Sequence, residues 1–188
     1  MKILGLTGGS RTGKSAACTA FARLGCGVID ADATYRTLCD TCEPMLKEIQ
    51  NVFGDVFSTD GKLDRKKLGV IVFADAQKLQ QLNAITHPYI RQAARDAFAA
   101  YSKRGCLLCI YDAPVLFEGQ METLCDNTRI ARIVARDAIT EEYAALRIDA
   151  QKDDAFYRER CDYIVQNDAD LDTLYTQVRK IYEDMVRK

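Results

Sequence analysis

The stretch ILGLTGGSRTGKS, residues 3–15, decides how the rest of the chain can fold. Its first residues are mostly apolar and predict a short buried strand, and an alanine-rich segment of helical composition follows its last serine. Between strand and helix lies the spacing Gly-x-x-x-x-Gly-Lys-Ser over residues 8–15. This is a complete phosphate-binding P-loop in the strand–loop–helix context that the motif requires. The stretch therefore predicts a nucleoside triphosphate site in an α/β fold.

The residues of the loop have distinct chemical purposes. We expect Gly8, Gly9 and Gly13 to let the backbone turn tightly and direct its N–H groups toward phosphate oxygens. The positive end of the following helix dipole adds to that attraction. Lys14 is a mobile charge for the β- and γ-phosphates, and Ser15 offers a hydroxyl to Mg²⁺.

Composition limits the partners that the protein is expected to have. The 188 residues suit one domain with a small inserted part, and they suffice to bury a real core. The chain has 26 basic and 27 acidic residues, and the basic residues are not clustered in a run. Nucleic acid is therefore not an expected partner. The apolar runs are too short to span a bilayer and no signal peptide precedes the first strand. We expect no membrane contact, a cytoplasmic location and a monomer.

The eight cysteines include two pairs with Cys-x-x-Cys spacing, Cys39 with Cys42 and Cys106 with Cys109. The second pair lies in or beside an apolar run typical of a strand, where positions three apart face opposite sides. No histidine stands near either pair, so a zinc site is not expected. Cytosolic thiols stay reduced, so we expect most of the cysteines to be small apolar residues in the core or along helices.

Carboxylates follow two expected strands. The segment CGVIDAD, residues 26–32, is a short strand ending in Asp30 and Asp32, which are candidates for handling a hydroxyl or Mg²⁺ at the carboxyl edge of a sheet. Either one can instead cap the next helix. The segment GCLLCIYDAPVLFE, residues 105–118, is another apolar strand, and its Asp112 is placed to reach a metal. The alternative for Asp112 is a surface turn.

Residues 33–104 show no further strand pattern and are expected to be helical. TDGK, residues 59–62, predicts a turn, and Asp64 can cap the helix that follows it. That helix is expected to run through residues 64–85. Pro88 then suits the first turn of a new helix that continues to the end of this part.

Basic side chains on two expected helices are candidates for phosphate contacts. His87, the only histidine, lies one helical turn before Arg91, so the two can line one face. A lone histidine is also often a structural residue. Residues 136–151 predict a polar helix with Arg136 and Arg147, which suit charge stabilisation during phosphoryl transfer. Their alternative is a solvated face with ion pairs along the helix.

Several motifs in order resemble the dephospho-coenzyme A kinase family over most of the chain. They are LTGG with GKS (6–15), VIDAD with a following arginine (28–36), GKLDR with VF (61–73), HPYIR (87–91), APVLFE (113–118), ARD (135–137), RIDAQ (147–151) and DYIVQND (162–168). The resemblance implies a three-layer α/β P-loop NTPase fold with a parallel sheet, a helical substrate-binding insertion and a helical lid. We expect one kinase domain: a core over about 1–32, 105–135 and 160–188, the insertion over about 33–104, and the lid over about 136–155.

The same resemblance implies an activity and roles for individual residues. The activity is Mg²⁺-dependent transfer of the γ-phosphoryl group of ATP to the ribose 3′-hydroxyl of dephospho-coenzyme A, the last step of coenzyme A synthesis. The implied catalytic residues are Lys14, Asp32 and Arg136, with Asp32 receiving or orienting the proton of the hydroxyl. The implied ATP-binding residues are Gly8, Gly9, Ser10, Arg11, Thr12, Gly13, Lys14, Ser15, Ala16 and Asn167. The implied substrate contacts are Asp32, Arg36, His87, Arg91 and Glu118, and the implied metal ligands are Ser15 and Asp112.

The chain departs from the family pattern in two places. Arg11, Thr12 and Ala16 differ from the residues usual in the loop, but none of these changes touches its glycines, Lys14 or Ser15. The family also has a parallel strand before the lid helix, where LCDNT is followed here directly by RIARIVARD. The segment is short by about ten residues, roughly one strand and its turn.

Without that strand the sheet would lack a central member. Either residues are missing from the sequence, or the fold reorganises, or the deletion is genuine, and we favour the first. Two other functions stay open at this point. One is another small-molecule P-loop kinase, and the other is a relative that binds ATP but is catalytically impaired by the lost strand.

Overall fold

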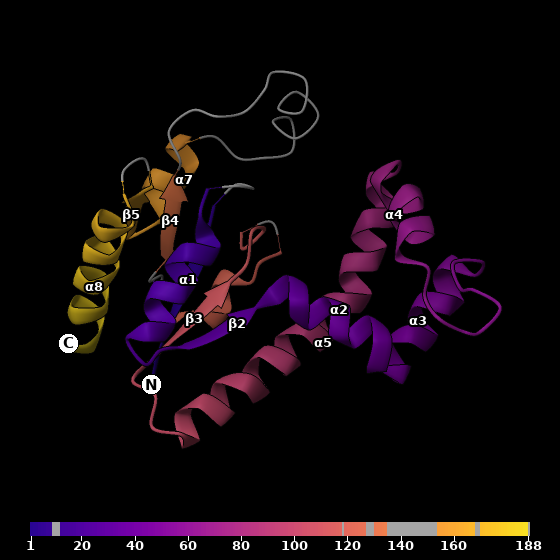
Figure 1. Ribbon diagram of the computed structural model, residues 1–188. Coiled ribbons are helices and arrows are strands. Elements are labelled where there is room, and N and C mark those ends of the chain that lie inside the picture. Colours follow the sequence, from indigo (N-terminus) through magenta and orange to yellow (C-terminus); the bar gives the residue numbers. More distant parts are fainter. Residues whose placement is uncertain (9–11, 118, 127–129, 135–153, 168–169, 188) are drawn as a thin grey trace. The chain divides into compact units, whose positions relative to one another are not determined.

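The computed structural model describes residues 1–8, 12–117, 119–126, 130–134, 154–167 and 170–187 (Figure 1). The chain divides into two compact units. The first, here called the sheet unit, comprises Met1–Ile29 and Phe98–Lys188. The second, here called the helical unit, comprises Asp30–Ala97. None of the described helices is long and apolar enough to cross a membrane.

A five-stranded sheet forms the centre of the sheet unit. Its strands are β1 (Lys2–Thr7), β2 (Gly27–Asp30), β3 (Leu108–Asp112), β4 (Ile130–Val134) and β5 (Tyr163–Gln166), in the order β2-β3-β1-β4-β5. β1 pairs in parallel with β3 and with β4, and β4 pairs in parallel with β5. The expected strands at the P-loop, at VID and before Asp112 are confirmed. Parallel strands end at a common edge, so this topology gathers the segments that follow β1 and β3.

The expectation that residues for one strand are missing before the lid helix is wrong, because the described sheet has a strand there. β4, with the sequence IARIV, lies between β1 and β5, pairing Leu6 with Ala131 and Arg132 with Ile164. The segment expected to lead into the lid helix therefore supplies this strand. Isoleucine and valine favour the extended chain, and a strand here covers the hydrogen-bonding edges that β1 and β5 would otherwise expose.

Helices cover both faces of the sheet. α1 (Lys14–Arg23) and α8 (Leu171–Arg187) pack on one face, and their core with the strands contains Leu4, Leu6, Phe21, Leu108, Ile110, Val178 and Ile181. The alternating residues of β3 point to the other face, where the ring of Tyr111 meets that of Phe98 edge to face at 5.9 Å. Phe98 belongs to the last turns of α5 (Ala76–Lys103). The arrangement gives three layers, as expected for this fold.

Four helices build the helical unit, and their bounds correct two expectations. They are α2 (Ala31–Thr41), α3 (Glu43–Phe53), α4 (Arg65–Phe73) and the first part of α5. Residues 64–85 do not form one helix, because α4 ends at Phe73 and the carboxylate of Asp75 accepts from the Gln77 N–H at 2.9 Å to begin α5. An aspartate that caps a new first turn favours a break in the helix.

Pro88 does not begin a helix but lies inside α5. A proline interrupts the hydrogen-bond ladder because it has no N–H to offer the carbonyl four residues earlier. The helix continues because both flanks are packed: Leu82, Thr86 and Ala94 are buried. Burial on either side of the proline outweighs the local cost, which sequence reasoning about Pro88 alone does not detect.

The helical unit has its own hydrophobic core. It contains Cys39, Met45, Ile49, Val56, Leu68, Val72 and Leu82. The expected turn at residues 59–62 is confirmed, with Gly61 at a φ of 79°, closing a short antiparallel bridge between Phe57 and Leu63. The remaining described helices are a 3₁₀ turn (Glu122–Leu124) and α7 (Asp154–Arg160), both in the sheet unit.

Candidate active site

The P-loop connects the end of β1 to the start of α1, as its sequence predicts. Gly8 follows the last residue of β1, and Gly13 precedes the first residue of α1. The Lys14 ammonium donates to the carbonyl oxygen of Gly8 at 2.8 Å, so the lysine side chain folds back across the loop. Gly9, Ser10 and Arg11 lie outside the described residues. The described ends of the loop are therefore held together by the residue expected to contact the transferring phosphate.

Gly13 is required for two structural reasons. Its φ of 87° lies in the left-handed region, which side chains disfavour. A Cβ at this position would also lie only 2.0 Å from Nδ2 of Asn167. That same Nδ2 donates to the carbonyl oxygen of Thr12 at 2.9 Å, which ties the chain just after β5 to the P-loop. Asn167, which the resemblance implies as an ATP-binding residue, thus contacts the loop backbone directly.

The first turn of α1 presents its backbone donors without a competing side chain. Gly13 is the N-cap and makes no side-chain cap hydrogen bond. Ser15 is exposed, and its hydroxyl makes no hydrogen bond to any described residue. Ala16 packs partly against the sheet core. An uncapped helix start with an available hydroxyl has the donors that phosphate oxygens and a hard cation require.

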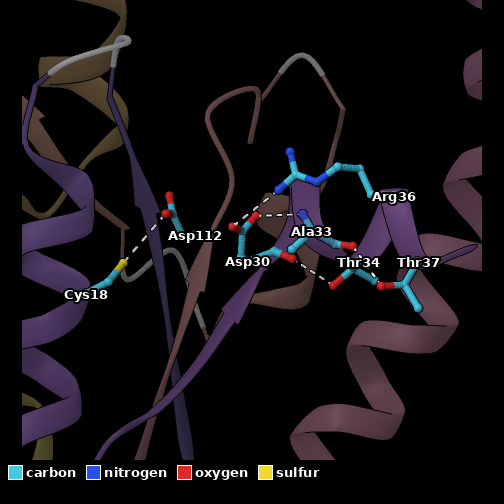
Figure 2. Close-up of polar contacts among 7 residues, drawn as sticks. All are labelled: Cys18, Asp30, Ala33, Thr34, Arg36, Thr37 and Asp112. Atoms are coloured by element: carbon cyan, nitrogen blue, oxygen red, sulfur yellow. Dashed lines mark hydrogen bonds and ion pairs between the residues drawn. The ribbon is translucent and has the colours of Figure 1, made fainter. Parts of the chain in front are cut away.

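Asp112 reaches the same edge of the sheet from the end of β3. It pairs in register with Leu6 of β1, and the following Ala113 N–H donates to the Leu6 carbonyl at 3.0 Å. Its carboxylate is partly buried and accepts from the thiol of Cys18 at 3.6 Å (Figure 2). The alternative of a surface turn does not fit, because Asp112 is the last residue of a buried strand.

Two residues that sequence reasoning missed support this edge. Thr7 is buried at the end of β1, and its hydroxyl donates to the carbonyl of Pro114 at 3.1 Å. Cys18 lies one helical turn after Lys14 and Ser15, so it faces the same side of α1. This helical spacing is the sequence feature that could have indicated that Cys18 lies on the same side as Lys14 and Ser15. The contact with Asp112, in contrast, depends on the pairing of β3 beside β1.

In the helical unit, the two aspartates of the VIDAD segment take different roles. The Asp30 carboxylate caps α2 by accepting from the Ala33 N–H at 2.8 Å, and its second oxygen lies 4.0 Å from the Arg36 guanidinium (Figure 2). Asp32 lies in the first turn of α2, is exposed, and has no hydrogen-bond or ion-pair partner among the described residues. Of the two carboxylates, Asp32 is the one that remains available to a ligand.

His87 and Arg91 share one face of α5, as expected from their spacing. The imidazole is half-buried. Burial and, secondarily, the nearby Arg91 charge lower the pKa of His87 below its ordinary value of 6.5. A neutral imidazole can donate or accept a hydrogen bond, whereas Arg91 supplies the positive charge. The pair therefore combines a neutral polar group with a cation on one helix.

The sequence model of the dephospho-CoA kinase family matches residues 2–173. The chain belongs to the dephospho-CoA kinase family. Among its relatives in this family, a dephospho-CoA kinase of Shouchella clausii is 36% identical over 185 residues, covering 93% of this chain and 94% of the relative. One of Thermobifida fusca is 36% identical over 198 residues, covering 100% of this chain and 98% of the relative.

Solved structures share the fold of this dephospho-CoA kinase family member. A protein of Thermus thermophilus superposes with a TM-score of 0.80 at 24% identity, covering 97% of both chains. Dephospho-CoA kinase from Campylobacter jejuni superposes with a TM-score of 0.72 at 24% identity, covering 98% of this chain and 97% of the other. These likenesses support the P-loop fold that the sequence implied.

Some residues that the family resemblance implies for the site lie outside the described part of the chain. They are Gly9, Ser10, Arg11, Glu118, Arg136 and Arg147, together with the expected lid helix. The described members fall into two sets. The sheet unit holds Gly8, Thr12, Gly13, Lys14, Ser15, Ala16, Asp112 and Asn167, and the helical unit holds Asp32, Arg36, His87 and Arg91.

Proposed function

We propose that this protein transfers the γ-phosphoryl group of ATP to the ribose 3′-hydroxyl of dephospho-coenzyme A, giving coenzyme A and ADP. Membership of the dephospho-CoA kinase family supports this reaction directly. The structural observation that carries it lies in the described ends of the P-loop: the Lys14 ammonium donates to the Gly8 carbonyl at 2.8 Å, and Gly13 opens a helix that has no side-chain cap. A lysine charge beside an uncapped helix start is typical of a phosphate-binding site.

ATP is held, in this proposal, by the backbone and side chains from Gly8 to Ala16 and by Asn167. Lys14 moves from the Gly8 carbonyl to the β- and γ-phosphates, where its charge offsets the negative charge that spreads over the transferring group. Asn167 keeps the loop in shape through its bond to the Thr12 carbonyl. Arg136 adds positive charge from the lid, proposed for residues 136–155.

The acceptor is bound by the helical part, proposed for about residues 33–104. Asp32 accepts the proton of the 3′-hydroxyl as its oxygen bonds to the γ-phosphorus and the bond from that phosphorus to ADP breaks. Arg36 and Arg91 neutralise phosphates of the acceptor, and Glu118 is a further contact to the acceptor. His87, kept neutral by its lowered pKa, hydrogen-bonds the acceptor without adding charge.

Mg²⁺ is proposed as the metal of the reaction, bound by Ser15 and Asp112. Both donors are oxygens on neighbouring segments at one edge of the sheet, the end of β3 and the start of α1. Mg²⁺ prefers this donor type and commonly takes one or two protein ligands together with substrate phosphates and water. When bound, the ion neutralises charge on the β- and γ-phosphates. The Cys18 thiol holds the Asp112 carboxylate in place.

A coupled assay of ADP release tests the reaction, run with ATP and MgCl₂ in the presence of dephospho-coenzyme A, of coenzyme A, or of adenosine. We expect ADP release only with dephospho-coenzyme A, a gain of one phosphoryl group in the acceptor by mass spectrometry, and loss of the activity with EDTA. Coenzyme A is the matched control, because its 3′-oxygen is already phosphorylated. Equal rates with adenosine would identify a different small-molecule kinase. ATP binding without any turnover would identify a catalytically impaired relative.

A cytoplasmic monomer completes the proposal. Sedimentation velocity, with and without ATP, is expected to give a single species with the mass of one chain. A species of twice that mass, at concentrations where the enzyme is assayed, would contradict the monomer.

A further inference from the structure

Two helices of the sheet unit end in the same backbone motif, and each motif is followed by a cysteine. At the end of α1, the Gly25 N–H donates to the Ala22 carbonyl at 3.0 Å, and the Cys26 N–H donates to the Phe21 carbonyl at 3.2 Å. Gly25 has a φ of 82°. This pair of reversed hydrogen bonds around a left-handed glycine is the Schellman motif. It places Cys26 immediately before β2.

The end of α5 repeats that motif. The Gly105 N–H donates to the Ser102 carbonyl at 3.0 Å, and the Cys106 N–H donates to the Tyr101 carbonyl at 3.2 Å. Gly105 has a φ of 80°. Cys106 therefore occupies the same place relative to α5 as Cys26 does relative to α1, and it lies just before β3.

Tyr101 brings the two strand starts together. Its backbone carbonyl accepts from Cys106, while its hydroxyl donates to the Val28 carbonyl at 3.2 Å. Its ring lies so close to Gly27 that a Cβ there would be 2.6 Å from it. β2 and β3 are also neighbours in the sheet. Both cysteines therefore lie at the edge where these strands begin, the edge opposite the P-loop. Figure 1 shows the two strands, β2 and β3.

Starts of neighbouring strands are a placement in which disulfides form. Neighbouring strands lie about 4.8 Å apart, and disulfides join residues whose Cα atoms are about 4.4–6.8 Å apart. The two thiols also interact electrostatically, because a charge on Cys106 adds to burial in raising the pKa of Cys26 to about 12. Cys26 is 8% exposed, whereas Cys106 is more exposed. An oxidant therefore reaches Cys106 first.

We propose that Cys26 and Cys106 are a redox-responsive dithiol, which a hydroperoxide converts into a disulfide. The Cys106 sulfur attacks the peroxide oxygen, the O–O bond breaks, and Cys106 becomes a sulfenic acid as water or an alcohol leaves. The Cys26 sulfur then attacks the Cys106 sulfur, and the hydroxyl group leaves as water with the Cys26 proton. Two thiols are oxidised by two electrons, and one peroxide is reduced. A thiol reductant reverses the change.

The position of the pair in the sequence gives the disulfide a structural consequence. The loop between Cys26 and Cys106 contains the entire helical unit, Asp30–Ala97. The bond therefore ties together the two chain segments through which that unit is inserted into the sheet unit. A crosslink that closes so long a loop restricts the unfolded chain and raises stability. This inference is independent of the proposed function.

Cys109, whose thiol also interacts electrostatically with Cys106 and Cys26, is a weaker partner for Cys106. Cys109 lies within β3, is 0% exposed, and its thiol contacts the Ile110 carbonyl at 3.9 Å. The Leu107 carbonyl between the two cysteines already accepts from the Lys2 N–H of β1, which holds this chain extended. Three residues of extended chain separate Cα atoms by about 10 Å, beyond the reach of a disulfide.

Peptide mapping of the full-length protein tests the pair. The folded protein is treated with hydrogen peroxide, remaining thiols are alkylated, and the trypsin digest is examined without reduction. We expect the protein to lose the mass of two hydrogen atoms and peptide 24–36 to be joined to peptide 105–129. Dithiothreitol is expected to release both peptides. A Cys106–Cys109 bond within one peptide, or over-oxidation of Cys106 without a crosslink, would overturn the proposal.

Variants separate the three thiols at this edge. Cys109→Ala, the matched control, is expected to keep the crosslink, and Cys106→Ser to abolish it. Peroxide is expected to raise the melting temperature of the wild type and of Cys109→Ala by several degrees, but not that of Cys106→Ser. A crosslink that survives in Cys106→Ser would contradict the assignment. Peptide 105–129 contains Cys106, Cys109 and Cys125, so fragmentation of the joined peptides must place the bond at Cys106. That result decides the question without the variants if either one fails to fold, and a bond at Cys109 or Cys125 would overturn the proposal.

Discussion

At the scale of single residues, adjacent carboxylates with similar sequence contexts have different structural roles. Asp30 is occupied by the Ala33 N–H and by Arg36, whereas Asp32, two residues later, is exposed and available. The reason is local: an aspartate that immediately precedes a helix captures the unpaired N–H groups of its first turn, so the next carboxylate is left for other uses. This difference selects Asp32 as the proposed base.

Replacing Asp32 with asparagine removes the proton acceptor but keeps the size of the side chain. We expect kcat to fall by about 100-fold or more while KM for ATP changes little, because the carboxylate acts on the acceptor hydroxyl. Steady-state kinetics with dephospho-coenzyme A measures both constants. Asp40→Asn, on the exposed face of the same helix, is the control and should behave as the wild type. An unchanged kcat in Asp32→Asn would assign the residue a structural role.

Lys14 carries the charge that is proposed to contact the transferring phosphate. Lys14→Ala is expected to lower turnover by at least about 100-fold, because the lysine charge serves the transferring phosphate. Its melting temperature should stay close to that of the wild type, because the hydrogen bond from Lys14 to the Gly8 carbonyl lies within the loop. Lys180→Ala, an exposed lysine on α8, controls for loss of charge. Near-normal turnover in Lys14→Ala would refute the P-loop assignment.

At the scale of elements, four helices begin at an aspartate that caps their first turn, whereas α1, which follows the P-loop, does not. α2 and α4 begin at aspartates whose carboxylates accept backbone N–H groups, and Asp75 and Asp170 do the same for α5 and α8. α1 begins at Gly13 with no side-chain cap, and so does α3 at Cys42, where Pro44 stands in the first turn and has no N–H to offer. The unpaired backbone N–H groups at a helix start are normally bonded by such side chains. Because no side chain caps α1, this helix start is accessible to phosphate.

The cap of α4 provides a stability test within the helical unit. Asp64 accepts from the N–H groups of Lys66 and Lys67, both at 3.0 Å. Asp64→Ala is expected to destabilise the protein by about 1 kcal/mol, whereas Asp64→Asn, which is an equally good cap, should cost much less. Urea unfolding followed by circular dichroism measures the two variants. Equal loss in both would mean that the negative charge, and not the cap geometry, stabilises α4.

At the scale of the whole molecule, the chain consists of two units with separate cores. The sheet unit is packed around Leu4, Phe21 and Ile110, and the helical unit around Met45, Ile49 and Val56. The only histidine of the protein belongs to the helical unit. Any contribution of histidine protonation to the pH dependence of stability therefore comes from this one residue.

The lowered pKa of His87 predicts the sign of that dependence. In the folded protein His87 resists protonation, so the unfolded chain binds the proton first as the pH falls below 6.5. The free energy of unfolding should therefore fall as the pH drops below 6.5, and the penalty disappears as the pH rises above 6.5. Carboxylates with lowered pKa values, such as Asp60 and Asp170, contribute only in more acidic solution.

Urea unfolding at pH 8 and pH 5 measures the effect. The difference in the free energy of unfolding between the two pH values should be smaller in His87→Gln than in the wild type, because glutamine does not titrate. An identical difference in both proteins would show that His87 does not contribute to the acid sensitivity.

Local sequence determined the parts of this protein whose geometry depends on neighbouring residues. Glycine spacing and Lys14 specify the P-loop between strand and helix, and Asp64 and Gly61 specify a cap and a turn. These features follow from backbone preferences and short-range hydrogen bonds, which act over a few residues. The family resemblance, which added the substrate, also came from the sequence, because it rests on the order of several such segments.

Only the tertiary structure decided the features that depend on distant packing. IARIV becomes the central strand because β1 and β5 offer unpaired edges on both sides of it, and Pro88 stays inside α5 because its flanks are buried. The contact of Cys18 with Asp112 and that of Asn167 with Thr12 join residues 94 and 155 positions apart. Long-range pairing of this kind is set by burial and strand order, which no local pattern in the sequence records.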